Sequence, residues 1–407
     1  MTDWNAAPAF EDEQKPSGRP NGLDHLQIYF AREVADIEIP PRGWLLGTAF
    51  CRKFISGLIA EGGAGKTAIR YAQYLACATG RSLPGEHVHH RCRCLIVCLE
   101  DDVDEVRRRL RAAMLHHGVV AEDIKDFLTY CAPRGLKLLK TDPRGNRSVG
   151  DLYDELRAAI EKHKIDIVGI DPFVKAHGVE ENDNNAIDQV CIMLADIGAE
   201  FDCAIDIVSH ARKGAGSPGD ADRDRGASAK KDAGRLIRTV TTMSTTEAEL
   251  FGVTAADRRL LIRVDDAKVN LAAPSSETMW FKLVGVQLGN TSALYPNGDT
   301  VQTVERWAPV DAFAKLSLTV SNQILDQIEA GPYDGGRYSP AVQAADRAAW
   351  HVVEACCPSL NSEQAKYVIK TWLKNGVLVS QEHVDPKSRK SRPSLFVGHR
   401  PSDTWQA

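Results

Sequence analysis

The chain has 407 residues, of which 43% are hydrophobic and 26% are charged, with 31 glycines. This composition is typical of a folded globular protein and excludes a peptide, a fibrous repeat and a wholly disordered chain. The 50 basic and 55 acidic residues give a net charge of -5, so any contact with nucleic acid must come from local basic patches. No apolar run is long enough for a membrane span and the first residues lack a signal-peptide pattern, so we expect a cytoplasmic protein without membrane contact.

Residues 1–25 are polar and interrupted by proline and glycine, and we expect a flexible leader there. From residue 26 to residue 288, short apolar runs alternate with amphipathic segments of helix length. This alternation predicts an α/β fold with a RecA-like, mostly parallel sheet that carries helices on both faces. The predicted strands are 54–60, 94–99, 165–170 and 203–209, and the predicted helices between them are 66–79, 104–117 and 185–200.

The second half of the chain changes character. After Asp232 we expect a helical segment and then two strands that extend the sheet, 259–264 and 279–284, with a hairpin turn at Asn297-Gly298. Residues 289–317 are expected to form a linker. Within 318–407 the predicted helices are 321–330, 341–356 and 362–375, and the predicted strands are 377–380 and 394–397. Three helices followed by a two-stranded ribbon is the order of a small winged helix-turn-helix domain.

The run Ala-Glu-Gly-Gly-Ala-Gly-Lys-Thr at 60–67 lies between a predicted strand and a predicted helix, as a phosphate-binding P-loop does. Its glycines let backbone N–H groups point at phosphates, and the helix N-terminus adds a positive dipole. We predict that Lys66 reaches the β- and γ-phosphates of ATP and that Thr67 binds Mg²⁺. The other predicted ATP contacts are Glu61, Gly62, Gly63, Ala64 and Gly65. Ala60 replaces the first glycine of the pattern, and the alternative is a turn that only joins strand to helix.

Acidic residues close two of the predicted strands. Asp171 follows an apolar run and is predicted to hold Mg²⁺, directly or through water. Glu100 is predicted to orient and deprotonate the attacking water, whereas Asp101 and Asp102 are assigned to the start of the next helix. His210, after the fourth predicted strand, is predicted to donate a hydrogen bond to the γ-phosphate. The alternative for His210 is a capping residue of the loop or helix.

A set of further motifs follows in order along about residues 40–285. They are Leu99–Asp102 with Arg107–Leu110, Ile170–Pro172, Glu180–Asp183, Ser209–Lys213, Arg225–Ser228, Asp232–Arg235 and Lys268–Asn270. Together with the P-loop, they resemble the motifs of RecA-like P-loop ATPases, and specifically of the hexameric replicative helicases of the RepA type, which are AAA family ATPases.

The resemblance implies Mg²⁺-dependent ATP hydrolysis at the subunit interfaces of a homo-oligomer, a hexameric ring. It implies Glu100 as the catalytic base and His210 as the phosphate sensor. A neighbouring subunit would supply an arginine finger, for which Arg235 matches best and Arg225 is the competitor. Lys268 lies where related helicases place a second basic group that reaches ATP from the neighbour.

Two groups of basic residues are candidates for DNA contact. RecA-like motors touch single-stranded DNA with inner loops, so the resemblance implies contacts by Lys213, Arg223, Lys230 and Lys231. The run 387–392 carries four positive charges in six residues at the position of a wing. Its Lys387, Arg389 and Lys390, with Lys370 between Lys366 and Lys374 on the preceding helix, are predicted to contact duplex DNA. The alternative is a solvated helix face and a floppy charged hairpin.

These features favour an ATPase coupled to DNA, a helicase or replication ATPase of a plasmid, prophage or other mobile element. The C-terminal region extends beyond the resemblance and favours a DNA-binding module of its own. One alternative is an ATP-switched DNA-binding regulator that reads duplex DNA without unwinding it. A kinase on a P-loop scaffold is the third alternative, and the basic groups expected to act from a neighbour argue against it.

Overall fold

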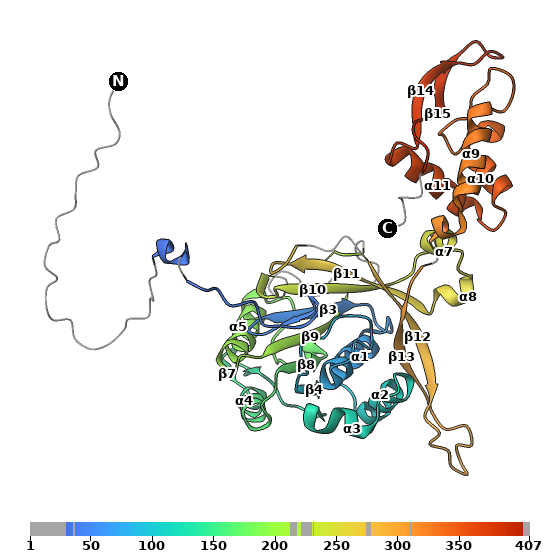
Figure 1. Ribbon diagram of the computed structural model, residues 1–407. Helices are drawn as coiled ribbons and strands as arrows, with labels where there is room; N and C mark the ends of the chain where they lie inside the picture. Colours follow the sequence, from blue (N-terminus) through green and yellow to red (C-terminus); the bar gives the residue numbers. More distant parts are fainter. Residues whose placement is uncertain are drawn as a thin grey trace, which may run out of the picture. The chain divides into compact units, whose positions relative to one another are not determined.

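The computed structural model describes residues 30–35, 37–211, 218–220, 230, 232–273, 278–309 and 311–401 (Figure 1). The predicted leader 1–25 and the candidates Lys213, Arg223, Arg225 and Lys231 lie outside the described residues. The chain divides into two units, Met1–Arg42 and Gly43–Ala407. In the first unit, Ala31–Ala35 form a 3-10 helix. None of the described helices has the length and apolar character that a membrane span requires.

A nine-stranded sheet forms the centre of the second unit, and its strand order is β13-β12-β11-β10-β3-β9-β8-β4-β5. These strands are β3 (Ile55–Ala60), β4 (Cys94–Cys98), β5 (Leu128–Cys131), β8 (Ile167–Asp171), β9 (Ala204–His210), β10 (Leu236–Thr242), β11 (Leu261–Val269), β12 (Met279–Gln287) and β13 (Thr300–Trp307). Pairing is parallel from β10 to β5 and antiparallel from β10 to β13. The predicted α/β fold with a mostly parallel sheet is therefore confirmed.

Helices cover both faces of the parallel part of the sheet (Figure 1). They are α1 (Lys66–Thr79), α2 (Val103–His116), α4 (Asp151–His163) and α5 (Asn184–Glu200). Successive residues of a strand point to opposite faces. In β4, Leu95 and Val97 accordingly join the core formed with α4 and α5, whereas Ile96 joins the core formed with α1 and α2. Burial on both faces explains why the central strands are continuous apolar runs.

The antiparallel part of the sheet differs from the predicted arrangement in two places. Residues 236–242, placed after Asp232 in a predicted helical segment, form strand β10, because they pair with β3 on one side and β11 on the other. Residues 300–307, within the predicted linker 289–317, form strand β13, which pairs with β12 along its whole length. Asn297-Gly298 lies in the connection between these two strands, where Gly298 has φ 59°.

Shorter elements complete the core. They are β1 (Trp44–Leu46), β2 (Phe50–Cys51), α3 (Ala121–Ile124), β6 (Leu139–Thr141), β7 (Arg147–Val149), α7 (Thr245–Phe251) and α8 (Ala255–Arg258), with 3-10 helices at Lys125–Phe127, Phe173–Lys175 and Ala312–Lys315. Strands β1 and β2 pair with each other, as do β6 and β7.

The C-terminal region contains three helices and a two-stranded ribbon around a hydrophobic cluster of its own. The elements are α9 (Leu318–Ala330), α10 (Trp350–Cys356), α11 (Ser362–Lys374), β14 (Leu378–Val384) and β15 (Ser391–Val397). The predicted helix 341–356 is wrong in its first half. There, backbone hydrogen bonds from Ser339 to Arg347 (2.7 Å) and from Ala349 to Ser339 (3.3 Å) close a loop that holds only a 3-10 turn, Ala345–Arg347.

Candidate functional site

The P-loop joins the end of β3 to the start of α1. Gly65 has φ 84° at the N-cap of α1, and a Cβ atom there would lie 2.6 Å from Leu283 Cδ2. Glycine is therefore required by both the backbone and the neighbouring strand. Gly62 and Gly63 face open space, since no heavy atom lies within 4 Å of a Cβ built on either. Ala60, the departure from the pattern, is the fully buried last residue of β3 and fits the core there.

Lys66 and Thr67 begin α1 and point toward the ends of the neighbouring strands. Lys66 Nζ lies 3.2 Å from His210 Nδ1, and Thr67 Oγ1 donates a hydrogen bond to Asp171 Oδ2 at 2.8 Å. The sequence-predicted P-loop lysine, threonine, Asp171 and His210 therefore lie together. A hydroxyl and a carboxylate oxygen side by side are the donor types that Mg²⁺ takes, so Thr67 and Asp171 fit the predicted ion.

Burial shapes the charges of this cluster. It lowers the pKa of Lys66, against the opposing effect of the Asp171 and Glu100 carboxylates. Burial also raises the pKa of Asp171, against the Thr67 hydrogen bond and the Lys66 charge. Burial thus disfavours both ionised forms, and a phosphate at Lys66 and a divalent cation at Asp171 would each add an opposite charge that favours them.

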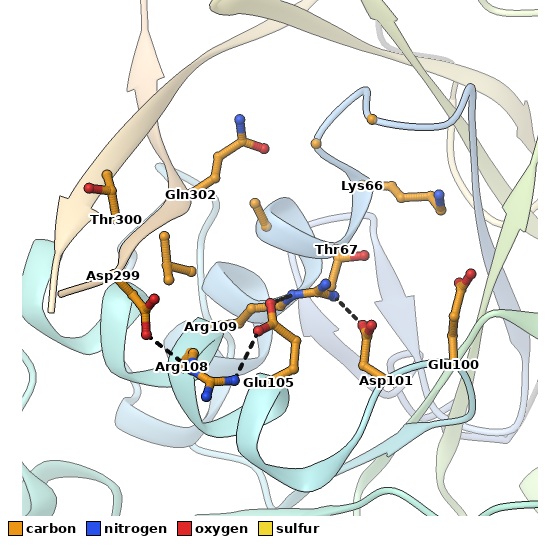
Figure 2. Close-up of a pocket in the computed structure, with 14 residues that line it drawn as sticks. Lys66, Thr67, Glu100, Asp101, Glu105, Arg108, Arg109, Asp299, Thr300 and Gln302 are labelled. Carbon is orange, nitrogen blue, oxygen red and sulfur yellow. Dashed lines mark hydrogen bonds and ion pairs between the residues drawn. The ribbon is translucent and has the colours of Figure 1, made fainter. Parts of the chain in front are cut away.

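The three acidic residues after β4 have different positions. Glu100 is exposed and lines the same pocket as Lys66 and Thr67 (Figure 2). Asp102 caps α2, because its side chain accepts from the N–H groups of Asp104 (3.1 Å) and Glu105 (2.9 Å). Asp101 forms an ion pair with Arg109 at 2.8 Å. Asp101 and Asp102 therefore bind α2, whereas Glu100 has neither a capping role nor an ion pair with α2 and faces the pocket.

The pocket over the P-loop has a volume of about 610 Å³, within the usual range for small-ligand sites. Its lining comes from the P-loop, the first turn of α1, the start of α2 and the start of β13. The lining residues that were not predicted from the sequence are Ala68, Asp101, Glu105, Arg108, Arg109, Asp299, Thr300, Val301 and Gln302. The Arg109 charge adds to the lowering of the Lys66 pKa and opposes the rise that burial gives to the Asp171 pKa. The sequence marked Arg107–Leu110 only as part of a motif.

Arg235 and Lys268 lie near the amino ends of β3 and β10, whereas this pocket lies at the carboxyl end of β3. The Arg235 N–H donates to Ile55 O at 3.0 Å, next to the start of β3, and Lys268 pairs with Ile237 near the start of β10. The P-loop leaves β3 at its other end, about 17 Å away at ~3.3 Å per residue. The structure therefore does not bring Arg235 or Lys268 to the pocket of their own chain. Their action through a neighbouring subunit stays a prediction.

The candidate DNA contacts differ in exposure. Lys230 is 5% exposed, and its Nζ lies 5.5 Å from the centre of the Phe173 ring, so little of it is available to DNA. Lys370 is exposed on α11. Lys387, Arg389 and Lys390 are exposed in the turn between β14 and β15. Contact of any of them with DNA stays a prediction.

Asp385 organises this β14–β15 turn. Its Oδ1 accepts from the N–H groups of Lys387 (2.8 Å) and Ser388 (2.9 Å), and its Oδ2 accepts from the Tyr333 hydroxyl (2.7 Å). These hydrogen bonds, that of Ser388 first, lower the pKa of Asp385 to about 2. The Asp385 carboxylate thus fixes the turn by hydrogen bonds. This order argues against the alternative of a floppy charged hairpin.

The order of this turn is expected to depend on pH. An ordinary aspartate has a pKa of roughly 3.9, so the stabilisation by Asp385 is complete above about pH 4 and is lost as the pH falls toward 2. Hydrogen-exchange protection of the Lys387 and Ser388 amides, corrected for intrinsic exchange, should fall over that range. Asp385→Asn should show the low value already at pH 5. Equal protection of wild type and Asp385→Asn at pH 5 would contradict the assignment.

A buried polar network fixes α1 against the sheet. Asp206 of β9 is completely buried and accepts from Arg70 Nη2 (2.7 Å) and from the Tyr74 hydroxyl (2.6 Å), both on α1. From Arg70 the network continues through Gln73 (2.7 Å), Glu86 (2.6 Å), Arg238 (2.6 Å) and Asp266 (3.0 Å). It therefore joins the helix that carries Lys66 and Thr67 to β9, β10 and β11.

Comparison with known families agrees with this site. Residues 22–216 match a family model described as an AAA domain. The matched range contains the P-loop, Glu100, Asp171 and His210, whereas Arg235 and the β12–β13 hairpin lie outside it. Residues 22–216 are thus similar to an AAA domain, as found in P-loop ATPases.

Proposed function

We propose that this protein is a Mg²⁺-dependent ATPase that works as a homo-hexameric ring and couples ATP hydrolysis to DNA, as a helicase or replication ATPase of a mobile element. The observation that carries the proposal is the single pocket in which Lys66, Thr67 and Glu100 meet, with Asp171 bonded to Thr67. The exposed Arg235 at the other edge of the sheet supports a ring, because each pocket would need it from a neighbour.

The residues of the pocket divide the work of hydrolysis. Lys66 and the N–H groups of the P-loop would bind the phosphates. Thr67 and Asp171 would hold Mg²⁺, which supplies positive charge to the phosphates when it is bound. Glu100 orients a water molecule and accepts its proton. The distance of 3.2 Å between His210 Nδ1 and Lys66 Nζ supports a role for His210 as the sensor of the phosphate that Lys66 would bind. These are the roles that a phosphoryl transfer to water requires.

ATP turnover by the full chain tests the proposal. We expect single-stranded DNA to stimulate turnover, with a steep dependence on protein concentration because the site is completed at an interface. Glu100→Gln should lower turnover by about 10² to 10⁴-fold while retaining ATP binding. Asp104→Asn is the matched control, since this exposed carboxylate at the start of α2 does not line the pocket. If the protein hydrolyses ATP but neither binds DNA nor is stimulated by it, the proposed coupling is contradicted.

The C-terminal region favours the second candidate, an ATP-switched regulator that binds duplex DNA. Three helices and a ribbon with exposed Lys387, Arg389 and Lys390 support a winged helix-turn-helix domain. A regulator predicts slow, DNA-indifferent turnover together with a sequence-specific footprint on duplex DNA and no strand displacement. A motor predicts stimulated turnover and strand displacement.

A further inference from the structure

The P-loop packs against the β12–β13 hairpin, and the same face of the hairpin continues past it. Leu283 of β12 fills the space beside Gly65 and pairs with Val304 of β13. Side chains of directly paired residues lie on one face, and every second residue returns to that face. The next pair on this face is Gly285 with Gln302, about 7 Å further along the strands. Gln302 therefore lies about 7 Å beyond the Leu283–Val304 pair that packs on the P-loop, on the same face of the hairpin.

The surroundings of Gln302 leave room for a flat ligand. Its partner across the strands, Gly285, has no side chain, and Gln302 itself is exposed and lines the pocket. Figure 2 shows the Gln302 side chain between β13 and the P-loop, with no hydrogen bond or ion pair to another lining residue. The far wall of the pocket is the ion pair of Arg108 Nε and Asp299 Oδ2 at 3.2 Å. A nucleotide with its phosphates at Lys66 and its base extended toward β13 would have that base beside Gln302.

The hydrogen-bonding groups of Gln302 fit adenine better than guanine. A side-chain amide offers one acceptor and one donor side by side, which match the N6 donor and N7 acceptor of adenine. Guanine presents two acceptors, O6 and N7, on the same edge, and an arginine reads them best. The arginine at hand, Arg108, is already engaged by Asp299 and by Glu105 at 3.5 Å.

We propose that Gln302 selects adenine, and that the β12–β13 hairpin forms the base subsite of the pocket. This inference rests on the proposed ATPase function and adds to it the residue that discriminates the base. It also assigns a role in nucleotide specificity to a hairpin that lies outside the matched range 22–216.

Binding of non-hydrolysable ATP and GTP analogues to the full chain, with inorganic tripolyphosphate as a third ligand, tests the proposal. Gln302→Ala should weaken ATP-analogue binding about tenfold and leave GTP-analogue and tripolyphosphate binding within about twofold of wild type. Gln287→Ala is the matched control. Gln287 lies on the same hairpin face two residues beyond Gly285, but it does not line the pocket, so its binding should equal that of wild type.

Three outcomes distinguish failure of base selection by Gln302 from failure of the proposed ATPase function. ATP binding that depends on Lys66 but is unchanged in Gln302→Ala would overturn base selection by Gln302 and leave the ATPase proposal standing. Weakening of all three ligands alike in Gln302→Ala would also overturn it, since the residue would then hold the hairpin in place. Wild-type protein that binds none of the three ligands would overturn the ATPase proposal itself.

Discussion

Replacing Arg235 with alanine is expected to lower ATP turnover by about 10³-fold or more, with nucleotide binding and subunit assembly retained. Its guanidinium is exposed at the edge of the sheet where β3 begins, away from the pocket of its own chain. It can act on ATP only in the pocket of a neighbour, where it would stabilise the negative charge of the transferred phosphoryl group. Steady-state turnover and nucleotide affinity of the full chain measure the two effects separately.

Mixing two inactive variants tests whether the arginine acts from a neighbour. In the proposed ring, Arg235→Ala subunits would keep Glu100 but lack the finger, and Glu100→Gln subunits would have the reverse defect. Mixed rings contain interfaces where an intact Glu100 meets an intact Arg235, so turnover should partly return. Arg259→Ala is the control and should retain wild-type turnover, because Arg259 is exposed before β11 and does not line the pocket. Full turnover in Arg235→Ala would move the finger to Lys268 or Arg225.

The parts of the site that the sequence predicts are those in which function depends on neighbours in the chain. The P-loop is one continuous segment, so the order of its glycines, Lys66 and Thr67 is enough to predict a phosphate-binding site. Asp171 and His210 are predictable because each ends an apolar strand, and parallel strands bring their ends to one edge of the sheet. The structure brings Asp171 to Thr67 and His210 to Lys66.

The part of the pocket that β13 lines has no such signal in the sequence. Strand β13 is an edge strand whose polar residues Thr300, Gln302 and Glu305 alternate with apolar ones only in part, so its sequence reads as a connection. Its role comes from pairing with β12 and from packing on α1 and α2, which are distant in the chain. Strand β10 escaped prediction for a similar reason, because its buried Arg238 and Thr239 interrupt the apolar pattern and are satisfied only by tertiary partners.

Asp206 is the clearest case of a residue whose role depends on tertiary contacts. In the sequence it is a carboxylate inside an apolar strand with no evident purpose. In the structure it is the buried anion for Arg70, one turn beyond the start of α1. Neither partner is identifiable without the fold, since 136 residues separate them.

Replacing Asp206 with alanine is expected to lower the free energy of unfolding by roughly 3–5 kcal/mol, the usual cost of leaving a buried charge without its partner. Arg70 is 1% exposed and would keep its positive charge beside the Phe50 ring, while the Tyr74 hydroxyl would lose its acceptor. Guanidinium denaturation of the full chain, followed by circular dichroism, measures the change. Asp202→Ala is the matched control, because the side chain of Asp202 is 58% exposed in the turn before β9. It should cost at most about 1 kcal/mol.

Removing both charges distinguishes the ion pair from simple packing. When a buried pair is replaced by apolar residues of similar volume, the change in stability is often small. Arg70→Met combined with Asp206→Leu should therefore recover much of the stability that Asp206→Ala loses. Because Arg70 follows Lys66 and Thr67 by one turn of α1, the double variant also shows whether the helix needs this anchor to hold its first turn at the phosphate site. Recovered stability with weakened ATP binding would mean that Asp206 positions the P-loop helix. Equal loss of stability in Asp206→Ala and Asp202→Ala would contradict the network as a source of stability.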